Sequence, residues 1–388
     1  MTNSIHSDRL NTVRVGSRRF ENSPFQDKWM NPDTVMGVYA GRYYSVYNGE
    51  DVEEGYWSLR RQAVLYDVPE RPVEISGPDA ERFLEYVFAR RISTLKTDRG
   101  RYAIACSHDG GLFMDGVLFK LADQRYWYVQ PDGALETWLL AHSNGFDVKV
   151  SDPQSRVLQI QGPASLEIMK AATEGELTEA MGYFHSGFFT IAGKQVYVSR
   201  TGWTGELGYE VYTQGRATDC PKLWDRLMAA GEPHGMKFGS ISSMEMRRIE
   251  AGILDNGTDF DISMTPYDAG LGSFVDLDKP DFIGRERLLN AHRNTKRLFG
   301  LKCPAGIPGY KEQVVDGGVV VGHVTAGAWS PYLQSGVGYV RFQAAGSWAG
   351  RKLSVQTADG QLRDCEILDL PFYDPEKLIP RGINQEIP

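Results

Sequence analysis

Apolar positions along the chain follow two spacings, and each change between them predicts where a strand gives way to a helix. At residues 73–88 an alternating stretch, VEIS, is followed by Gly-Pro and then by a helical stretch in which Phe83 and Val87 share one face. The same order of strand, Gly-Pro and helix returns in RVLQIQGPASLEIM, Arg156 to Met169. Two such units, about eighty residues apart, predict two related α+β halves that pack side by side.

The rest of the pattern is mixed up to about Arg297 and almost purely strand-like after it. Helical spacing is expected within residues 52–68, which run into a strand, and at 133–145, 222–231 and 242–252. Hairpin strands are expected at 101–130 and 188–212. The strand-rich end of the chain predicts a small β-barrel or sandwich.

These patterns divide the chain into three parts. The first thirty or so residues are polar, so residues 1–35 are expected to form an N-terminal arm outside the core. Residues 36–295 form the α+β region with two subdomains, and residues 296–388 form the C-terminal β domain. A chain of 388 residues that is 41% hydrophobic and 24% charged can build two or three soluble, well-cored domains.

Composition also limits the partners. The formal net charge of -8 argues against nucleic acid or an anionic membrane as the main partner, so a small molecule is expected. The N-terminus lacks the apolar segment of a signal peptide, and no apolar run is long enough to span a bilayer. The four cysteines are far apart, as is typical of reduced thiols in a cytoplasmic protein. Composition does not define the oligomeric state.

Several catalytic motifs are missing from the sequence. The seven histidines are scattered without HxH or HExxH spacing, so no metal site is expected. The sequence has no Gly-x-Ser-x-Gly elbow, no P-loop and no GxGxxG fingerprint. These absences disfavour hydrolases, nucleotide triphosphatases and simple dehydrogenases.

TGWTGELGYEVY, residues 201–212, is the segment richest in candidate functional groups. Its three glycines allow a tight backbone or the close approach of a ligand. A carboxylate such as Glu210 accepts two parallel hydrogen bonds and therefore suits a ring with adjacent N–H groups. Alternation along a strand puts Glu210 and Tyr212 on one face. The alternative is a hairpin loop whose acids face water.

Two further segments carry charge among apolar neighbours. On a helix, Arg247 and Arg248 would point about 100° apart, so one can be interior while the other is solvated. The interior arginine could clamp a carboxylate, or the pair could form surface ion pairs with Glu245 or Glu250. Asp115 interrupts the apolar run LFMDGVLF, where a carboxylate is costly unless it is satisfied or used.

The chain resembles the family of the T-protein (aminomethyltransferase) of the glycine cleavage system and its tetrahydrofolate-dependent demethylase relatives. The likeness runs from about Tyr43 to about Phe372 and rests on several separated motifs. These are VEISGPDAERFL, RYAIACSHDGGLFMDGVLF, LQIQGPAS, RTGWTGELGYEVY, RRIEAG, TPYDAGLGSFVDLDKPDFIGRERL and GHVTAGAWSP.

The resemblance implies an α+β fold of three domains in a ring, with two related α+β domains and a C-terminal β-barrel around a central folate-binding hole. It implies that tetrahydrofolate is the cofactor and that Glu210 holds the pterin ring. The other residues that it points to for cofactor binding are Tyr102, Arg248, Trp203 and Trp329. Asp115 and Tyr209 are the candidate catalytic residues.

One position departs from the T-protein pattern. There the stretch that matches GGLFMD reads Gly-Gly-x-x-Asp-Asp, and its first Asp lies near the reactive nitrogen of folate. This chain has Met114 at that position and keeps only the second acid, Asp115. Because neighbouring strand residues face opposite sides, Met114 is expected to present its thioether to the cavity, and Asp115 to satisfy backbone groups or position a neighbour.

The departure favours one reaction among three. A pocket without the acid suits transfer of a methyl group from a small S-, O- or N-methylated donor to N5 of tetrahydrofolate, as in the family's S- and O-demethylases. Aromatic side chains such as Tyr43 could attract a cationic donor. The alternatives are aminomethyl or methylene transfer that yields 5,10-methylenetetrahydrofolate, and folate binding without catalysis. The last resembles iron–sulfur assembly relatives, but KPDFIGRE lacks their cysteine.

Overall fold

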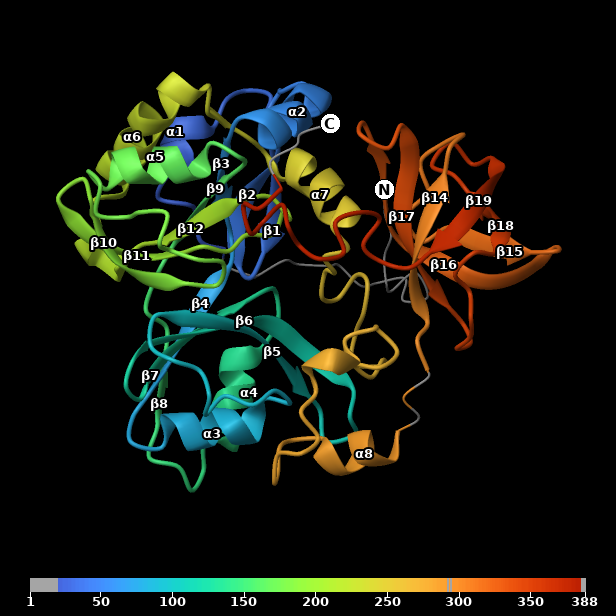
Figure 1. The fold of residues 1–388 in the computed structure, drawn as a ribbon, viewed down its shortest axis with the longest axis horizontal. Coiled ribbons are helices and arrows are strands. Elements are labelled where there is room, and N and C mark those ends of the chain that lie inside the picture. Colours follow the sequence, from blue (N-terminus) through green and yellow to red (C-terminus); the bar gives the residue numbers. More distant parts are fainter. Residues whose placement is uncertain (1–19, 292, 294, 385–388) are drawn as a thin grey trace, which may run out of the picture.

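The computed structural model of the protein describes residues 20–291, 293 and 295–384. Figure 1 shows three lobes: two mixed α+β lobes and a β-barrel. Helix α7 (Ile241–Glu250) lies between the first lobe and the barrel and packs on barrel strand β16 (Val319–Ser330). The three-part α+β architecture expected from the resemblance is confirmed.

The first lobe is built on a six-stranded sheet. Its strands, in spatial order, are β10 (Ser186–Ile191), β11 (Lys194–Ser199), β12 (Gly208–Tyr212), β9 (Val157–Gln161), β3 (Val64–Val68) and β13 (Lys237–Phe238). Helices α5 (Ser165–Ala172) and α6 (Cys220–Gly231) cover one face and form an apolar core with it. The other face turns towards the second lobe and α7.

The lobe also contains the N-terminal elements α1 (Gln26–Trp29), the hairpin β1 (Val35–Tyr39) and β2 (Arg42–Tyr47), and α2 (Val52–Arg61). Short 3₁₀ turns lie at Gly215–Ala217 and Glu232–His234.

The second lobe is a five-stranded antiparallel sheet with two helices. Its spatial order is β5 (Arg99–Cys106), β6 (Leu112–Ala122), β7 (Arg125–Gln130), β4 (Arg71–Ser76) and β8 (Lys149–Ser151). Helices α3 (Ala80–Val87) and α4 (Leu135–His142) pack on one face through leucines and aromatic residues. The opposite face carries Val117 and Phe119 to the first lobe.

The repeated strand–Gly-Pro–helix unit is confirmed. Gly77 follows β4 and Gly162 follows β9, and their φ angles are +127° and +125°. Such a backbone conformation is rarely adopted by residues with a Cβ atom. A Cβ at either glycine would also lie 2.6 Å from a backbone carbonyl oxygen, that of Asp147 or of Gln62. Both turns therefore need glycine.

The C-terminal domain is a closed β-barrel and not a sandwich. Its closed order is β14 (Leu298–Cys303), β17 (Ser335–Phe342), β16, β15 (Gln313–Asp316), β18 (Lys352–Gln356) and β19 (Leu362–Leu368). A connecting segment with a 3₁₀ turn (Gly272–Phe274) and α8 (Arg285–Asn290) leads into it. After β19 the chain returns to α7, where Phe372 N–H donates to the carbonyl of Glu250 at 3.2 Å.

The sequence predicts an N-terminal arm at residues 1–35. Residues 1–19 lie outside the described residues, so only residues 20–35 can be compared with this prediction. From residue 25 onward the chain is not an arm. Phe25 and Trp29 are buried in the core of the first lobe, four residues apart on one face of the short helix α1. The apolar residues that mark this docking are too few to stand out from their polar surroundings. None of the helices in the described part of the chain could cross a membrane.

Candidate functional site

Strand β12 presents a carboxylate to the middle of the molecule. Glu210 and Tyr212 share the face of β12 that packs towards the second lobe, whereas Tyr209 lies on the opposite face under α5 and α6. The hydroxyl of Tyr209 is buried and finds no hydrogen-bond partner among the described residues. Because strand neighbours point to opposite faces, the structure separates Tyr209 from Glu210. This placement corrects the expectation of a catalytic role for Tyr209.

The carboxylate of Glu210 is 7% exposed and surrounded by donors, so it is not an acid of a solvated loop. Burial raises its pKa, while the hydroxyl donors around it act in the opposite direction. Its partners are Gln159 Nε2 at 2.9 Å, Tyr212 OH at 2.7 Å, Ser199 Oγ at 3.2 Å and Thr201 Oγ1.

Two acceptors beside Glu210 lack donors. Gln159 lies directly opposite Glu210 on β9, and its Oε1 is buried and has no partner within the described ranges. The same holds for Oε2 of Glu70. Burial raises the pKa of Glu70 to about 8, and repulsion from Glu210 is the second largest cause of this rise. An unsatisfied buried acceptor is costly, so these atoms suit a bound group that brings N–H or O–H donors.

Asp115 belongs to the same inter-lobe region. On β6 it shares a face with Val117 and Phe119, and Phe119 packs against Tyr212, which is on the Glu210 face. Tyr102 OH donates to Asp115 Oδ2 at 2.8 Å, and Oδ1 is buried without a partner among the described residues. Burial raises the pKa of Asp115 to about 7, even though the bond from Tyr102 lowers it. The carboxyl can therefore give or take a proton near neutral pH.

Met114 lies on the other side of this strand. It is 1% exposed in the core of the second lobe, under Gly133 and among residues that α3 and α4 cover. The expectation that its thioether faces the cavity is corrected. Residues 114 and 115 do point to opposite faces of the strand, as expected. However, the face that packs against the first lobe is the one that carries Asp115, not Met114.

Both arginines of α7 are buried, so neither is the solvated neighbour that the helical geometry allowed, and Arg248 also pairs with Glu245. Arg248 forms an ion pair with Asp259 at 2.6 Å, and its guanidinium carbon lies 5.1 Å from the ring centroid of Trp203. Arg247 pairs instead with Glu206, at 2.6 Å. The two predicted cofactor residues Arg248 and Trp203 therefore contact each other.

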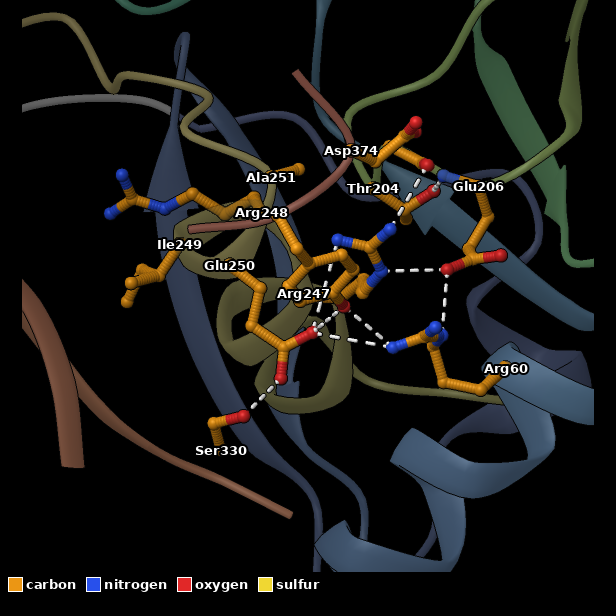
Figure 2. A network of polar contacts seen from close by, with 12 residues as sticks. Arg60, Thr204, Glu206, Arg247, Arg248, Ile249, Glu250, Ala251, Ser330 and Asp374 are labelled. Atoms are coloured by element: carbon orange, nitrogen blue, oxygen red, sulfur yellow. Dashed lines mark hydrogen bonds and ion pairs between the residues drawn. The ribbon is translucent and has the colours of Figure 1, made fainter. Parts of the chain in front are cut away.

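A buried network on the Arg247 side joins the first lobe, α7, the barrel and the C-terminal segment (Figure 2). One carboxylate oxygen of Glu206 lies between the Nε atoms of Arg60, at 2.9 Å, and Arg247, at 2.6 Å. The carboxylate of Glu250 accepts from Ser330 of the barrel at 2.6 Å and from Tyr373 of the C-terminal segment. Two arginines balance two glutamates, so the network carries no net charge.

The sequence interpretation did not include Arg60. A usable signal was present, because Arg60 follows Tyr56 by four residues and so shares its helix face. Both side chains are buried, and both contact Glu250.

The glycines of the 201–208 loop serve internal packing. A Cβ at Gly202 or Gly208 would lie 2.1 or 2.3 Å from Oε1 of Gln161. Gln161 in turn accepts from Thr204 Oγ1 at 2.8 Å and donates to the carbonyl of Thr201 at 3.2 Å. These two glycines make room for a protein side chain rather than for a ligand.

Trp329 is half-buried on β16. No hydrogen bond, ion pair or ring contact recorded for the described residues joins it to Glu210 or Asp115. Across residues 20–291, 293 and 295–384, no group of three or more His, Cys, Asp or Glu side chains is arranged to bind one metal ion together.

The comparisons with known proteins agree with this architecture. The "GCVT N-terminal domain" family matches residues 31–279, and the "Glycine cleavage T-protein C-terminal barrel domain" family matches residues 296–374. An aminomethyltransferase of Streptomyces avermitilis is 32% identical over 361 residues, which is 88% of this chain and 95% of that protein. One of Clostridium botulinum (strain Okra / Type B1) is 31% identical over 327 residues, 81% of this chain and 87% of that protein.

Two further matches differ in what they cover. The trimethylamine-oxide aldolase of Ruegeria pomeroyi is 32% identical over 85% of this chain, but only 44% of that protein is matched. The crystal structure of glycine cleavage system aminomethyltransferase T from Bartonella henselae has a TM-score of 0.81 at 22% identity. It covers 91% of this chain and 98% of that one, and it shows the fold. The chain belongs to the glycine cleavage T-protein (GCVT) family of folate-dependent one-carbon transferases.

Proposed function

We propose that the protein transfers a one-carbon unit at the oxidation level of formaldehyde from a small amine donor to tetrahydrofolate, giving 5,10-methylenetetrahydrofolate. The observation that carries this proposal is Asp115: an acid with a pKa of about 7 lies on the inter-lobe face, held by Tyr102. The argument for methyl transfer rested on a pocket without an acid, and it loses that support.

The residues around Glu210 fit a pterin ring. The amino-pyrimidinone edge of a pterin offers adjacent N–H groups, and the carboxylate of Glu210 and the orphaned Oε1 of Gln159 are neighbouring acceptors. Tetrahydrofolate, when bound, would supply two nitrogens, N5 and N10, to take up the carbon.

A cationic amine is the donor that the surroundings of Asp115 favour. Asp255 lies close enough to raise the pKa of Asp115, and the hydroxyl of Tyr39 donates to Asp255 at 3.5 Å. Clustered carboxylates and tyrosine faces attract an ammonium group and disfavour an anion.

Asp115 is proposed to move the proton that this transfer needs. Two bonds of the transferred carbon would break, the C–N bond to the amine and the bond to its second heteroatom, such as the sulfur of an aminomethyl thioether, while bonds to N5 and N10 form. Each electron pair stays on the departing atom, and the protonated carboxyl of Asp115 supplies the proton that lets the amine leave. N5–H and N10–H would release two protons, of which one returns to Asp115 and the other goes to the second leaving group, so Asp115 ends the cycle unchanged. Tyr102 holds the carboxyl in place throughout.

A second candidate is methyl transfer to N5, as in the demethylases of the family. It is favoured by the apolar residue Met114 at the position of the T-protein's first acid. Asp115 would then serve only to keep Tyr102 in position.

The product distinguishes the two candidates. Purified protein is incubated with tetrahydrofolate and, in turn, an aminomethyl thioether of lipoamide, trimethylamine N-oxide and dimethylsulfoniopropionate, and folates are identified by mass spectrometry. We expect 5,10-methylenetetrahydrofolate from an amine donor, and loss of that product in Asp115→Asn. Formation of 5-methyltetrahydrofolate alone would overturn the leading proposal in favour of the second.

A further inference from the structure

Two histidines of the second lobe lie together on the side of the sheet opposite Asp115. His108 is in the turn that joins β5 to β6, and His142 is the last residue of α4. Their Nε2 atoms are 3.2 Å apart, and the contact is exposed to solvent. Helix α4, which ends at His142, packs on the face of the sheet that carries Met114, whereas Asp115 is on the opposite face.

The protonation of His142 is fixed by its backbone. Its Nδ1 lies 2.8 Å from the carbonyl oxygen of Trp138, which can only accept, so Nδ1 must carry the proton. A neutral His142 then presents a lone pair at Nε2, towards His108. Histidines that bind metal are typically oriented in this way, with one nitrogen donating to a backbone carbonyl and the other facing the ion.

The spacing of the two nitrogens also suits an ion. Two ligand nitrogens on one tetrahedral ion, with bonds of about 2.0–2.1 Å, are separated by about 3.3–3.4 Å. The 3.2 Å between the two Nε2 atoms is close to this value. Without an ion, His108 must donate an N–H···N hydrogen bond to His142. With an ion, His108 moves its proton to Nδ1 and offers a second lone pair.

We propose that His108 and His142 form a surface site for a divalent transition-metal ion of the class of Zn²⁺, Ni²⁺ and Cu²⁺, with water completing the coordination shell. Imidazole suits these ions, whereas Mg²⁺ and Ca²⁺ prefer oxygen. The neighbouring Asp109 is directed to Arg287, 3.9 Å away, and the described residues supply no third ligand.

The bound ion fastens the turn before β6 to the end of α4. This turn leads directly into the strand that carries Asp115. The ion therefore stabilises the base of that strand without contact with the pterin-binding residues, and the site is independent of the proposed reaction.

Trp138 provides a built-in reporter. Its ring centroid is 4.1 Å from that of His142 and 6.1 Å from that of His108, so bound Cu²⁺ quenches its fluorescence. Cu²⁺ is titrated into the wild type and into Trp138→Phe, which identifies the fraction of quenching that comes from Trp138. Zn²⁺, which does not quench, is then added as a competitor, and melting temperatures are measured with Zn²⁺ and with chelator.

Single-histidine variants decide the outcome. We expect saturable quenching, its reversal by Zn²⁺ and a Zn²⁺-dependent rise in melting temperature, all lost in His108→Ala and in His142→Ala. His142→Gln serves as a second variant if His142→Ala melts early in chelator. The matched control, His323→Ala, removes an exposed histidine of the barrel and should behave as the wild type. Quenching that survives in either histidine variant, or no saturable quenching in the wild type, overturns the proposal and leaves a simple hydrogen bond.

Discussion

Tyr102 on β5 donates its phenolic hydrogen to Asp115 on β6 at 2.8 Å, and Asp115 is only 9% exposed. The bond holds one oxygen of the carboxyl and leaves the other without a partner among the described residues. A buried acid with one fixed and one free oxygen is positioned to exchange a proton with a ligand.

Removing the phenolic hydroxyl should move the pH dependence of turnover. The bond from Tyr102 lowers the pKa of Asp115, so Tyr102→Phe raises that pKa above its wild-type value of about 7. If protonated Asp115 is the acid, the fall in kcat at alkaline pH shifts to higher pH in the variant. The measurement is kcat against pH for both proteins, with Tyr310→Phe, at an exposed tyrosine of the barrel domain, as the control. An unmoved alkaline limb would show that another group supplies the proton.

The carboxyl of Asp115 should also make the free energy of unfolding depend on pH. Because burial raises the pKa of Asp115 from 3.8 to about 7, the folded protein binds a proton that the unfolded chain releases between these values. This group therefore makes the free energy of unfolding fall as pH rises through that window. Asp115→Asn removes this contribution, so the variant should gain stability relative to the wild type from about pH 4 to about pH 8. Urea unfolding at several pH values tests this, and a constant difference would contradict it.

The buried ion pairs around Glu206 should matter far more than those on the surface. Glu206→Gln leaves Arg60 and Arg247 without their shared carboxylate, and breaking such a buried pair costs about 3–5 kcal/mol. The matched control is Glu54→Gln, which breaks an exposed pair with Lys237 and should cost about 0–1 kcal/mol. Denaturant unfolding measures both. Equal effects would mean that burial does not make these ion pairs more important for stability.

Restoring the T-protein's first acid should not create a catalyst. Met114 is buried in the core of the second lobe, with the amide of Asn256 3.8 Å from its Sδ as a polar neighbour, so Met114→Asp buries a carboxylate in mostly apolar surroundings and should strongly destabilise the lobe. Met114→Leu conserves the volume and should cost less than about 1.5 kcal/mol. Thermal melting and an activity assay on both variants test this. A folded Met114→Asp variant with increased aminomethyl transfer would show that this position faces the site.

Local patterns predicted more of this fold than of its site. The two Gly-Pro turns follow from sequence because the requirement is local: each strand must turn sharply into its helix, at a φ that favours glycine. The burial of Phe25 depends on a surface formed by residues more than a hundred positions away, and sequence spacing carries no such information.

The predictions for the site were limited in the same way, because local patterns carry no information on how the sheets pack. The pattern placed residues 114 and 115 on opposite faces of a strand, which the structure confirms. It could not say which face docks on the first lobe, because that depends on the packing of two sheets. The burial of Arg247 was likewise not predictable from its own helix. It depends on Glu206, which lies in the loop before β12 and pairs with the buried guanidinium.

Two adjacent residues of β12 give the sharpest test of pterin binding. Glu210→Gln replaces an oxygen that accepts by an NH₂ that donates, so the paired N–H groups of a pterin lose their partner. Hydrogen bonds to a charged group contribute about 1.5–3 kcal/mol. Losing them should raise the dissociation constant for tetrahydrofolate roughly ten- to hundredfold. Isothermal titration calorimetry measures this constant, and circular dichroism shows whether the variant is folded.

Tyr209→Phe is the matched control for that change. It removes a buried hydroxyl with no partner among the described residues, on the opposite face of the same strand. Losing an unsatisfied polar group should leave stability unchanged or improved and should not alter folate affinity. If Tyr209→Phe weakens binding as much as Glu210→Gln does, β12 does not present its Glu210 face to the pterin. The same conclusion follows if a folded Glu210→Gln binds normally, and the proposed site would then have to move to the orphaned acceptors of Glu70 and Asp115.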